Sequence, residues 1–186
     1  AIIAIDQQSI DNIGRWPWPR DVHARMIDKL AQAQAKVVGT TIFFAEPQLD
    51  PGLVYINRLL ALEQQARDQI VVPIEPSAEA DPMAEPSAPA VNPLDAFGAT
   101  LREAEAALNT DRQLADSMKK AGNVALPMLF LDGEPQGRPD KPLPEFVRAT
   151  ALTNVSGSEP LPPLTLDVSA GVIEQLGTVA AAVGHL

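Results

Sequence analysis

The chain lacks cysteine, which excludes disulfide bonds, thiolate metal sites and cysteine nucleophiles. Aromatic residues are scarce, at 4% of 186 residues, and only two of them are tryptophans. No apolar run reaches the roughly 18 residues that span a bilayer, and no signal peptide is visible. Basic residues number 14 against 24 acidic ones, and the resulting net charge of −10 disfavours binding to nucleic acid or to anionic lipid surfaces.

Proline is abundant instead, with 18 residues, and a hydrophobic content of 46% is sufficient for a core. The length fits a single domain, which we assign to residues 1–186. The sequence begins on AIIAID and ends on AAAVGHL, so we expect a domain cut from a longer protein. Residues 71–93 are rich in Pro, Ala and Glu and poor in large apolar side chains, which predicts an inserted arm or mobile linker.

The first part of the chain predicts a strand–helix–strand unit. Residues 1–5 and 36–44 are apolar, β-rich runs typical of buried strands, and residues 20–35 carry apolar side chains at helical spacing. A connection of this kind makes the two strands parallel. Asp6 and Glu46 would then lie at the same carboxyl edge of the sheet, where open α/β sheets bind ligands.

Other segments complete an α/β fold, with a mostly parallel central sheet of about five strands flanked by helices and a Pro-rich insertion between the second and third core strands. Gly14 and Gly122 are placed to end helices. The pattern predicts helices at residues 9–13, 53–70, 94–108, 111–120 and 169–177, and strands at residues 123–131 and 178–186.

The run GRWPWPR at residues 14–20 contains both tryptophans and has two interpretations. In the functional one, the prolines hold an extended backbone, so Trp16 and Trp18 project to the same side as a platform for a ligand. Arg15 and Arg20 would pair with a carboxylate of the ligand or lie over an indole face.

In the structural interpretation, which we favour, the same run is a packing corner before a helix. A buried indole would cover the edge of the sheet and stabilise the domain by several kcal/mol, on the order expected for its area. The arginines would then bond to acidic side chains, for which the candidates are Asp6, Asp11, Asp21 and Glu46.

Catalytic and metal-binding motifs are missing from the sequence. Only His23 and His185 could serve as a histidine base, and both are more typical of surface or packing positions. Asp6 and Glu46 could converge in a carboxylate-based hydrolase, which we keep as the weakest hypothesis. No EF-hand or other dense oxygen motif occurs, so we expect no catalytic residues, no metal and no cofactor.

Several blocks together resemble a known family: AIIAID, SIDNIGRWPWPRDVHARMIDKLAQAQAKVVG, IFFAEP, DRQLADSMKKAGNVALP and a final VGHL. They are similar to the second type of CHASE domain, the cyclases/histidine kinases associated sensory extracellular domain. The resemblance covers residues 1–47 and 111–131 well and residues 140–186 weakly.

The resemblance implies an extracytoplasmic sensor on the periplasmic side of the inner membrane, in a bacterial transmembrane receptor. Such domains are followed by membrane helices and a cytoplasmic nucleotide cyclase or kinase, and a homodimer is expected because these outputs work in pairs. The ligand would be a small molecule or a protein. The alternative is a periplasmic protein-interaction module that uses the Pro-rich arm and senses no small molecule.

The sequence departs from the family pattern in three places. Thr41 stands where the family usually carries an aspartate in the second strand, so an anionic or metal role there is not expected. Residues 48–110 form a large insertion. The polar segment that follows the final G-H-[LV] in the family does not occur.

Overall fold

The computed structural model describes residues 1–69, 93–132, 143–151, 156 and 166–185. The chain divides into two compact units, of which the first is residues 1–48 with 110–186 and the second is residues 49–109. The first unit contains helices α1 (Gln7–Ile13), α2 (Arg20–Gln32), α5 (Thr110–Ala121), α6 (Glu145–Ala149) and α7 (Glu174–Gly177), and strands β1 (Val38–Gly39), β2 (Val124–Asp132), β3 (Leu166–Ala170) and β4 (Ala182–His185). The second contains α3 (Pro51–Gln69) and α4 (Pro93–Leu108).

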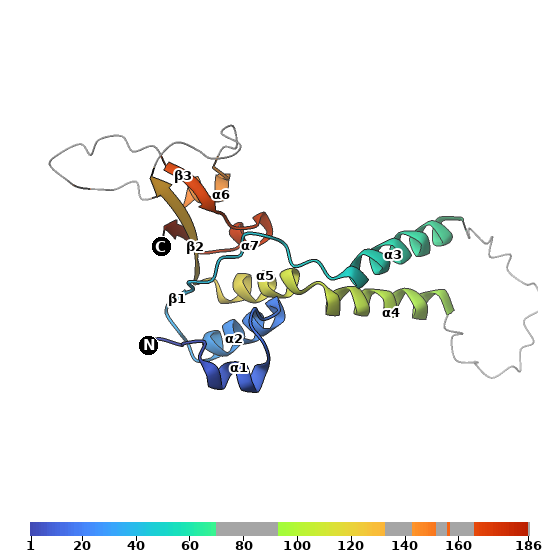
Figure 1. The fold of residues 1–186 in the computed structure, drawn as a ribbon. Helices are drawn as coiled ribbons and strands as arrows, with labels where there is room; N and C mark the ends of the chain where they lie inside the picture. The colour runs from blue at the N-terminus through green and yellow to red at the C-terminus, as the bar shows by residue number, and fades with distance from the viewer. Residues whose placement is uncertain (70–92, 133–142, 152–155, 157–165, 186) are drawn as a thin grey trace, which may run out of the picture. The chain divides into compact units, whose positions relative to one another are not determined.

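The sheet of the first unit is organised around β2 (Figure 1). Its first half pairs in parallel with β1 on one side, with Val38 opposite Val124, and in parallel with β4 on the other. Its second half pairs with β3 in the antiparallel sense. The described residues therefore contain a mixed α/β fold with three parallel strands and one antiparallel strand, where we expected about five.

The core of this unit lies between the sheet and the helices. α5 contacts both α2 and α7, and its apolar positions Leu114 and Met118 are fully buried because they fall on one helical face. Val124 and Met128 of β2 are buried at even spacing against them. The predicted helices at 20–35 and 111–120 and the predicted strand at 123–131 are confirmed as α2, α5 and β2, and β2 has parallel neighbours in β1 and β4.

Two of the predicted glycine stops are confirmed by their backbone angles. Gly14 ends α1 with φ of 124°, and Gly122 ends α5 with φ of 68°. Both lie in the left-handed region, which glycine enters without the steric cost of a Cβ.

The predicted buried strand at residues 1–5 is wrong in this structure. This segment is irregular and exposed, and Ile2 keeps 96% of its surface accessible. An apolar run favours a strand only where a sheet edge supplies backbone partners, and none of the described strands pairs with it. The predicted strand at 36–44 shrinks to Val38–Gly39, because beyond Thr40 the backbone leaves the ladder and Phe44 accepts from the amide of Ile173.

The C-terminal part also needs a correction, because the predicted helix at 169–177 is only Glu174–Gly177. The preceding residues belong to β3, where Leu166, Val168 and Ala170 alternate with polar residues, as strands do. The predicted strand at 178–186 is present as β4. The predicted arm at residues 71–93 lies almost wholly outside the described residues.

The second unit is a helical hairpin that matches the helices predicted at 53–70 and 94–108. α3 and α4 run antiparallel: Gly52 lies beside Leu108 at one end, and Arg67 pairs with Asp95 at 2.6 Å at the other. Within the described part of the chain, no helix combines the length and apolar character needed to cross a bilayer.

Candidate functional site

The GRWPWPR run forms the turn from α1 into α2, and Trp18 is its buried member. The Trp18 side chain is 8% exposed, and its indole Nε1 donates a hydrogen bond of 2.7 Å to the carbonyl oxygen of Gly14. This bond closes the turn on itself and satisfies the one polar atom of the ring. Trp16 meets Trp18 edge to face, with 5.7 Å between the ring centroids.

His23 joins these rings from the first turns of α2. It is 3% exposed and lies 5.9 Å from the ring of Trp16 and 5.6 Å from that of Phe44. Burial lowers the pKa of His23, the positive charge of Arg20 lowers it further, and Asp21 opposes them. His23 is thus a neutral packing residue at physiological pH. We call Trp16, Trp18, His23 and Phe44 the aromatic corner.

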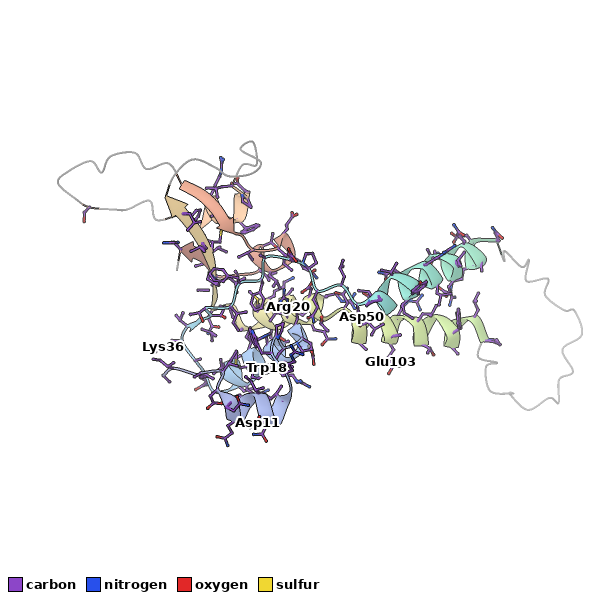
Figure 2. The ribbon with its side chains drawn as sticks, in the orientation of Figure 1. Asp11, Trp18, Arg20, Lys36, Asp50 and Glu103 are labelled. Atoms are coloured by element: carbon purple, nitrogen blue, oxygen red, sulfur yellow. The ribbon has the colours of Figure 1, made fainter. Side chains whose placement is uncertain are left out.

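Arg20 links the aromatic corner to the rest of the unit; Figure 2 labels it together with Trp18. Its Nε lies 3.0 Å from a carboxylate oxygen of Asp111, the second residue of α5, and its Nη2 donates to the carbonyl of Glu46 at 2.9 Å. Its guanidinium also stacks over the ring of Phe44, 4.5 Å from the centroid. One side chain therefore holds α2, α5 and the segment after β1 together.

Gln48 completes this network through its backbone and its side chain. The amide of Gln48 donates to the other carboxylate oxygen of Asp111 at 2.7 Å, while its side-chain oxygen accepts from the amide of Arg20 at 2.7 Å. The amide of Arg20 is one of the orphan donors of the first turn of α2, so Gln48 acts as its cap from a distant segment.

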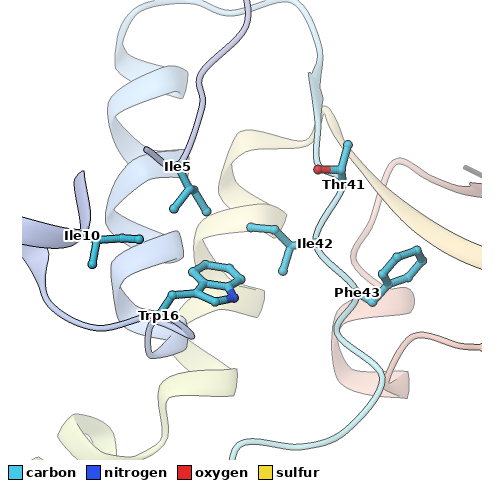
Figure 3. A pocket seen from close by; sticks show the side chains of 6 residues that line it. All are labelled: Ile5, Ile10, Trp16, Thr41, Ile42 and Phe43. Carbon is cyan, nitrogen blue, oxygen red and sulfur yellow. The ribbon is translucent and has the colours of Figure 1, made fainter. Parts of the chain in front are cut away.

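A groove opens on the other side of Trp16 (Figure 3). Its volume is about 560 Å³, and the Trp16 ring, 38% exposed, forms part of its wall. Ile5 and Ile42 converge on the indole in this view. None of the six lining side chains is charged. We call this the Trp16 groove; it is lined by Ile5, Ile10, Trp16, Thr41, Ile42 and Phe43.

The structure separates the two tryptophans, which the sequence placed on one ligand platform. They do contact each other, but Trp18 is buried under the turn and only Trp16 faces the groove. Arg20 is engaged inside the protein, and Arg15 is exposed. The structural interpretation therefore describes Trp18 and Arg20, whereas Trp16 keeps a surface that can meet a ligand.

The two predicted carboxylates belong to different segments, Asp6 to the start of α1 and Glu46 to the segment after β1. Asp6 caps α1, and one of its oxygens accepts from the amide of Ser9 at 2.8 Å and from its hydroxyl at 2.6 Å. These bonds lower the pKa of Asp6. The backbone carbonyl of Glu46 accepts a hydrogen bond from Arg20, and Glu46 itself is exposed.

Sequence reasoning missed the partner of Arg20. We named four acidic candidates near it, but the carboxylate belongs to Asp111, which lies 91 residues away. Asp111 was expected only as the first residue of the helix at 111–120, and no local pattern links it to Arg20. The available signal was weak: an acidic residue in the first turn of an amphipathic helix that opens after an insertion. In the part of the chain that the structure describes, no cluster of three or more His, Asp or Glu residues could hold a metal ion.

These features define an α/β domain in which Arg20 and Gln48 hold the aromatic corner in place. The groove beside that corner has no charged lining residue and suits an apolar group. The chain belongs to the CHASE2 domain family, whose model matches residues 1–185. CHASE2 domains are extracellular sensory domains and not catalytic ones. Comparisons with curated proteins and with solved structures gave no significant match.

Proposed function

We propose that this chain is the extracytoplasmic sensor of a bacterial transmembrane receptor, and that it controls a cytoplasmic nucleotide cyclase or kinase. Membership of a sensory family supports the class. The observation that carries the proposal is the Trp16 groove, because the Trp16 ring is accessible there while the other residues of the aromatic corner are buried.

The lining of the groove indicates the kind of ligand. A buried charge on a ligand would need a partner to offset its desolvation, and none of the lining side chains supplies one. Thr41 is the only lining residue with a side-chain hydroxyl, and it stands where the family usually has an aspartate. We therefore expect a small, neutral ligand with an aromatic or branched aliphatic group.

The walls of the groove also provide a route to a signal. Ile5 comes from the irregular N-terminal segment, Ile10 from α1, and Thr41 to Phe43 from the segment after β1. A ligand that fills the groove binds these segments only when they are close together. It therefore favours one arrangement of the N-terminal segment over others, which is what a sensor requires.

Fluorescence titration with N-phenyl-1-naphthylamine, a neutral apolar fluorophore, tests the groove. In Trp18→Phe, Trp16 is the only tryptophan, and we expect saturable energy transfer from it to the probe. In Trp16→Phe, we expect weaker binding and less transfer from the buried Trp18. Equal binding by the two variants, or none by either, would remove the ligand site from this proposal.

Receptors with these outputs act in pairs, so we also propose that the parent protein is a homodimer. The alternative, an interaction module without a small-molecule ligand, predicts no saturable binding of apolar probes. It predicts capture of another protein that depends on the Pro-rich arm.

A further inference from the structure

The α3–α4 hairpin buries a charged side chain between its helices while large apolar side chains remain exposed. The positions through which the helices meet include Glu63, which is 3% exposed, and Gly98, which leaves room for its carboxylate. Arg67 and Arg102 both pair with Glu63. Larger apolar residues remain outside: Tyr55 is 69% exposed, and Leu62 is 52% exposed.

Three of the four exposed large apolar residues of α3 share one face, and the fourth, Val54, lies one helical turn before Arg58 on the outer flank. Tyr55, Leu59 and Leu62 each precede by one residue the positions Ile56, Leu60 and Glu63 that face α4. Such a row lies about 100° round the helix from the contact.

Phe97, 48% exposed, likewise precedes Gly98 on α4. Because the helices are antiparallel, rows displaced in the same sense lie on the same face of the hairpin. We call this the hairpin face; it consists of Tyr55, Leu59, Leu62, Ala66, Phe97, Thr100, Ala104 and Ala107.

The hairpin face has no charged residue, although the chain carries a net charge of −10. The Thr100 hydroxyl donates to the carbonyl of Ala96 at 3.0 Å, so its burial would leave no unsatisfied donor. An apolar face with charged residues at its edges is the composition of an interface core and rim.

The charges at the edges indicate the occupant. Arg58 lies five residues before Glu63, and Glu103 lies five residues after the opposing Gly98, so the two charges lie at the same height on α3 and α4. Both are exposed on the outer flanks of the hairpin, and neither has an ion-pair partner among the residues that the structure describes.

A two-fold axis along the hairpin places α3 of one copy on α4 of the other. It thereby sets each Arg58 beside the Glu103 of the second copy. An axis across the hairpin would instead place α3 on α3 and the two Arg58 side chains near each other, with mutual repulsion.

We infer that the hairpin face binds a second copy of this chain and forms an antiparallel four-helix bundle in which α3 packs on the α4 of the other copy. The inference rests on the proposed pairing of receptors and names the surface that brings it about. Apolar burial supplies the affinity, and the Arg58–Glu103 pairs at the rim select the arrangement.

Sedimentation equilibrium on the 186-residue chain tests this inference. We expect a dimer at micromolar concentration, and Leu62→Lys should weaken it by about 100-fold or more, as for a charge buried in an interface. Ala61→Lys adds the same charge to an exposed position on the opposite face and should leave the dimer unchanged. Circular dichroism should show equal helix content in both variants. If the wild-type chain is still monomeric at a concentration of about 100 micromolar, which is in the range of a weak Kd, the inference is overturned.

A charge-reversal cycle tests the arrangement. Arg58→Glu and Glu103→Arg should each weaken the dimer by a few-fold, and the double variant should restore it, since each rim pair contributes roughly 0.2–1 kcal/mol. A double variant weaker than both single variants would contradict the proposed packing. A monomeric chain that still binds the fluorophore would refute the dimer surface alone, whereas a dimer without probe binding would refute the groove alone.

Discussion

The two compact units of this protein differ in the apolar core that they bury. In the first unit, Leu114, Met118 and Leu176 have no accessible surface, and a charged pair lies at the margin of the core. In the hairpin, the contact between the helices buries a glutamate, while a tyrosine and several large apolar residues remain exposed.

The difference indicates which unit has a substantial core of its own. The first unit has a fully buried apolar core, although apolar residues outside that core, among them Ile2, Ile13 and Val37, are exposed. The hairpin has a narrow interface and an outward apolar face, which is the pattern of an element that completes its burial with a partner. The first unit is therefore suited to recognition of a small molecule, and the hairpin to association.

The largest effect is expected at the centre of the first unit's corner. Trp18→Ala removes a buried ring and leaves a cavity, so we expect it to lower the free energy of unfolding by about 3–5 kcal/mol. Urea denaturation measures this value. A Trp18→Ala variant as stable as the wild type would show that the corner is not part of the folding core.

The next effect concerns the charged pair that joins distant parts of the chain. Arg20→Ala leaves Asp111 buried with the amide of Gln48 as its one remaining partner among the described residues, at a cost of about 2–4 kcal/mol. Arg20→Met combined with Asp111→Leu should cost less than the sum of the two single changes. Strict additivity in this double-mutant cycle would contradict a direct coupling.

A smaller effect should appear as pH falls. The pKa of His23 is lowered in the folded protein from its ordinary value of 6.5, so the unfolded chain takes up the proton first. The stabilisation from neutral His23 is present above pH 6.5 and is lost as pH decreases from there through the lowered folded pKa.

Urea midpoints at pH 7.5 and 5.5, chosen about one unit either side of the ordinary histidine pKa, measure this dependence. In His23→Phe the decrease between these conditions should be smaller than in the wild type, and His185→Phe controls for the loss of a histidine elsewhere. An equal decrease in all three proteins would assign the pH dependence to other groups.

The smallest effect is expected for the buried charge of the hairpin. Glu63→Leu removes a desolvated carboxylate, while Arg67 keeps Asp95 as a partner and Arg102 is exposed to water, so no buried charge is left unpaired and the expected change is within about 1 kcal/mol. Loss of more than about 3 kcal/mol in urea denaturation would show that Glu63 is as important to its unit as Arg20 is to the first.

The sequence predicted the elements whose signals are local. α2 and α5 follow from apolar spacing, and the ends at Gly14 and Gly122 follow from the conformational freedom of glycine. The strand expected at residues 1–5 failed because pairing depends on a distant sheet edge. The Arg20–Asp111 contact could not be predicted, because it joins residues that are 91 positions apart in the sequence.

The candidate site was predicted only in outline. The run at residues 14–20 was identified, but its residues were treated as one group. Extended spacing suggested that both rings point the same way, and only the fold shows that one ring is covered by the turn and the other lines a groove. Thr41 was noted as a departure from the family pattern, and the structure places it in the wall of that groove.

The central claim is that Trp18 maintains the fold while Trp16 and Thr41 recognise an apolar group. Titration of N-phenyl-1-naphthylamine into Thr41→Asp, paired with its thermal melt, tests this most directly, because the change adds one charge to an exposed position of the groove. The account predicts binding weakened by about tenfold or more, equivalent to about 1.4 kcal/mol, with the melting temperature unchanged. Unchanged binding in a protein that melts as the wild type does would contradict it.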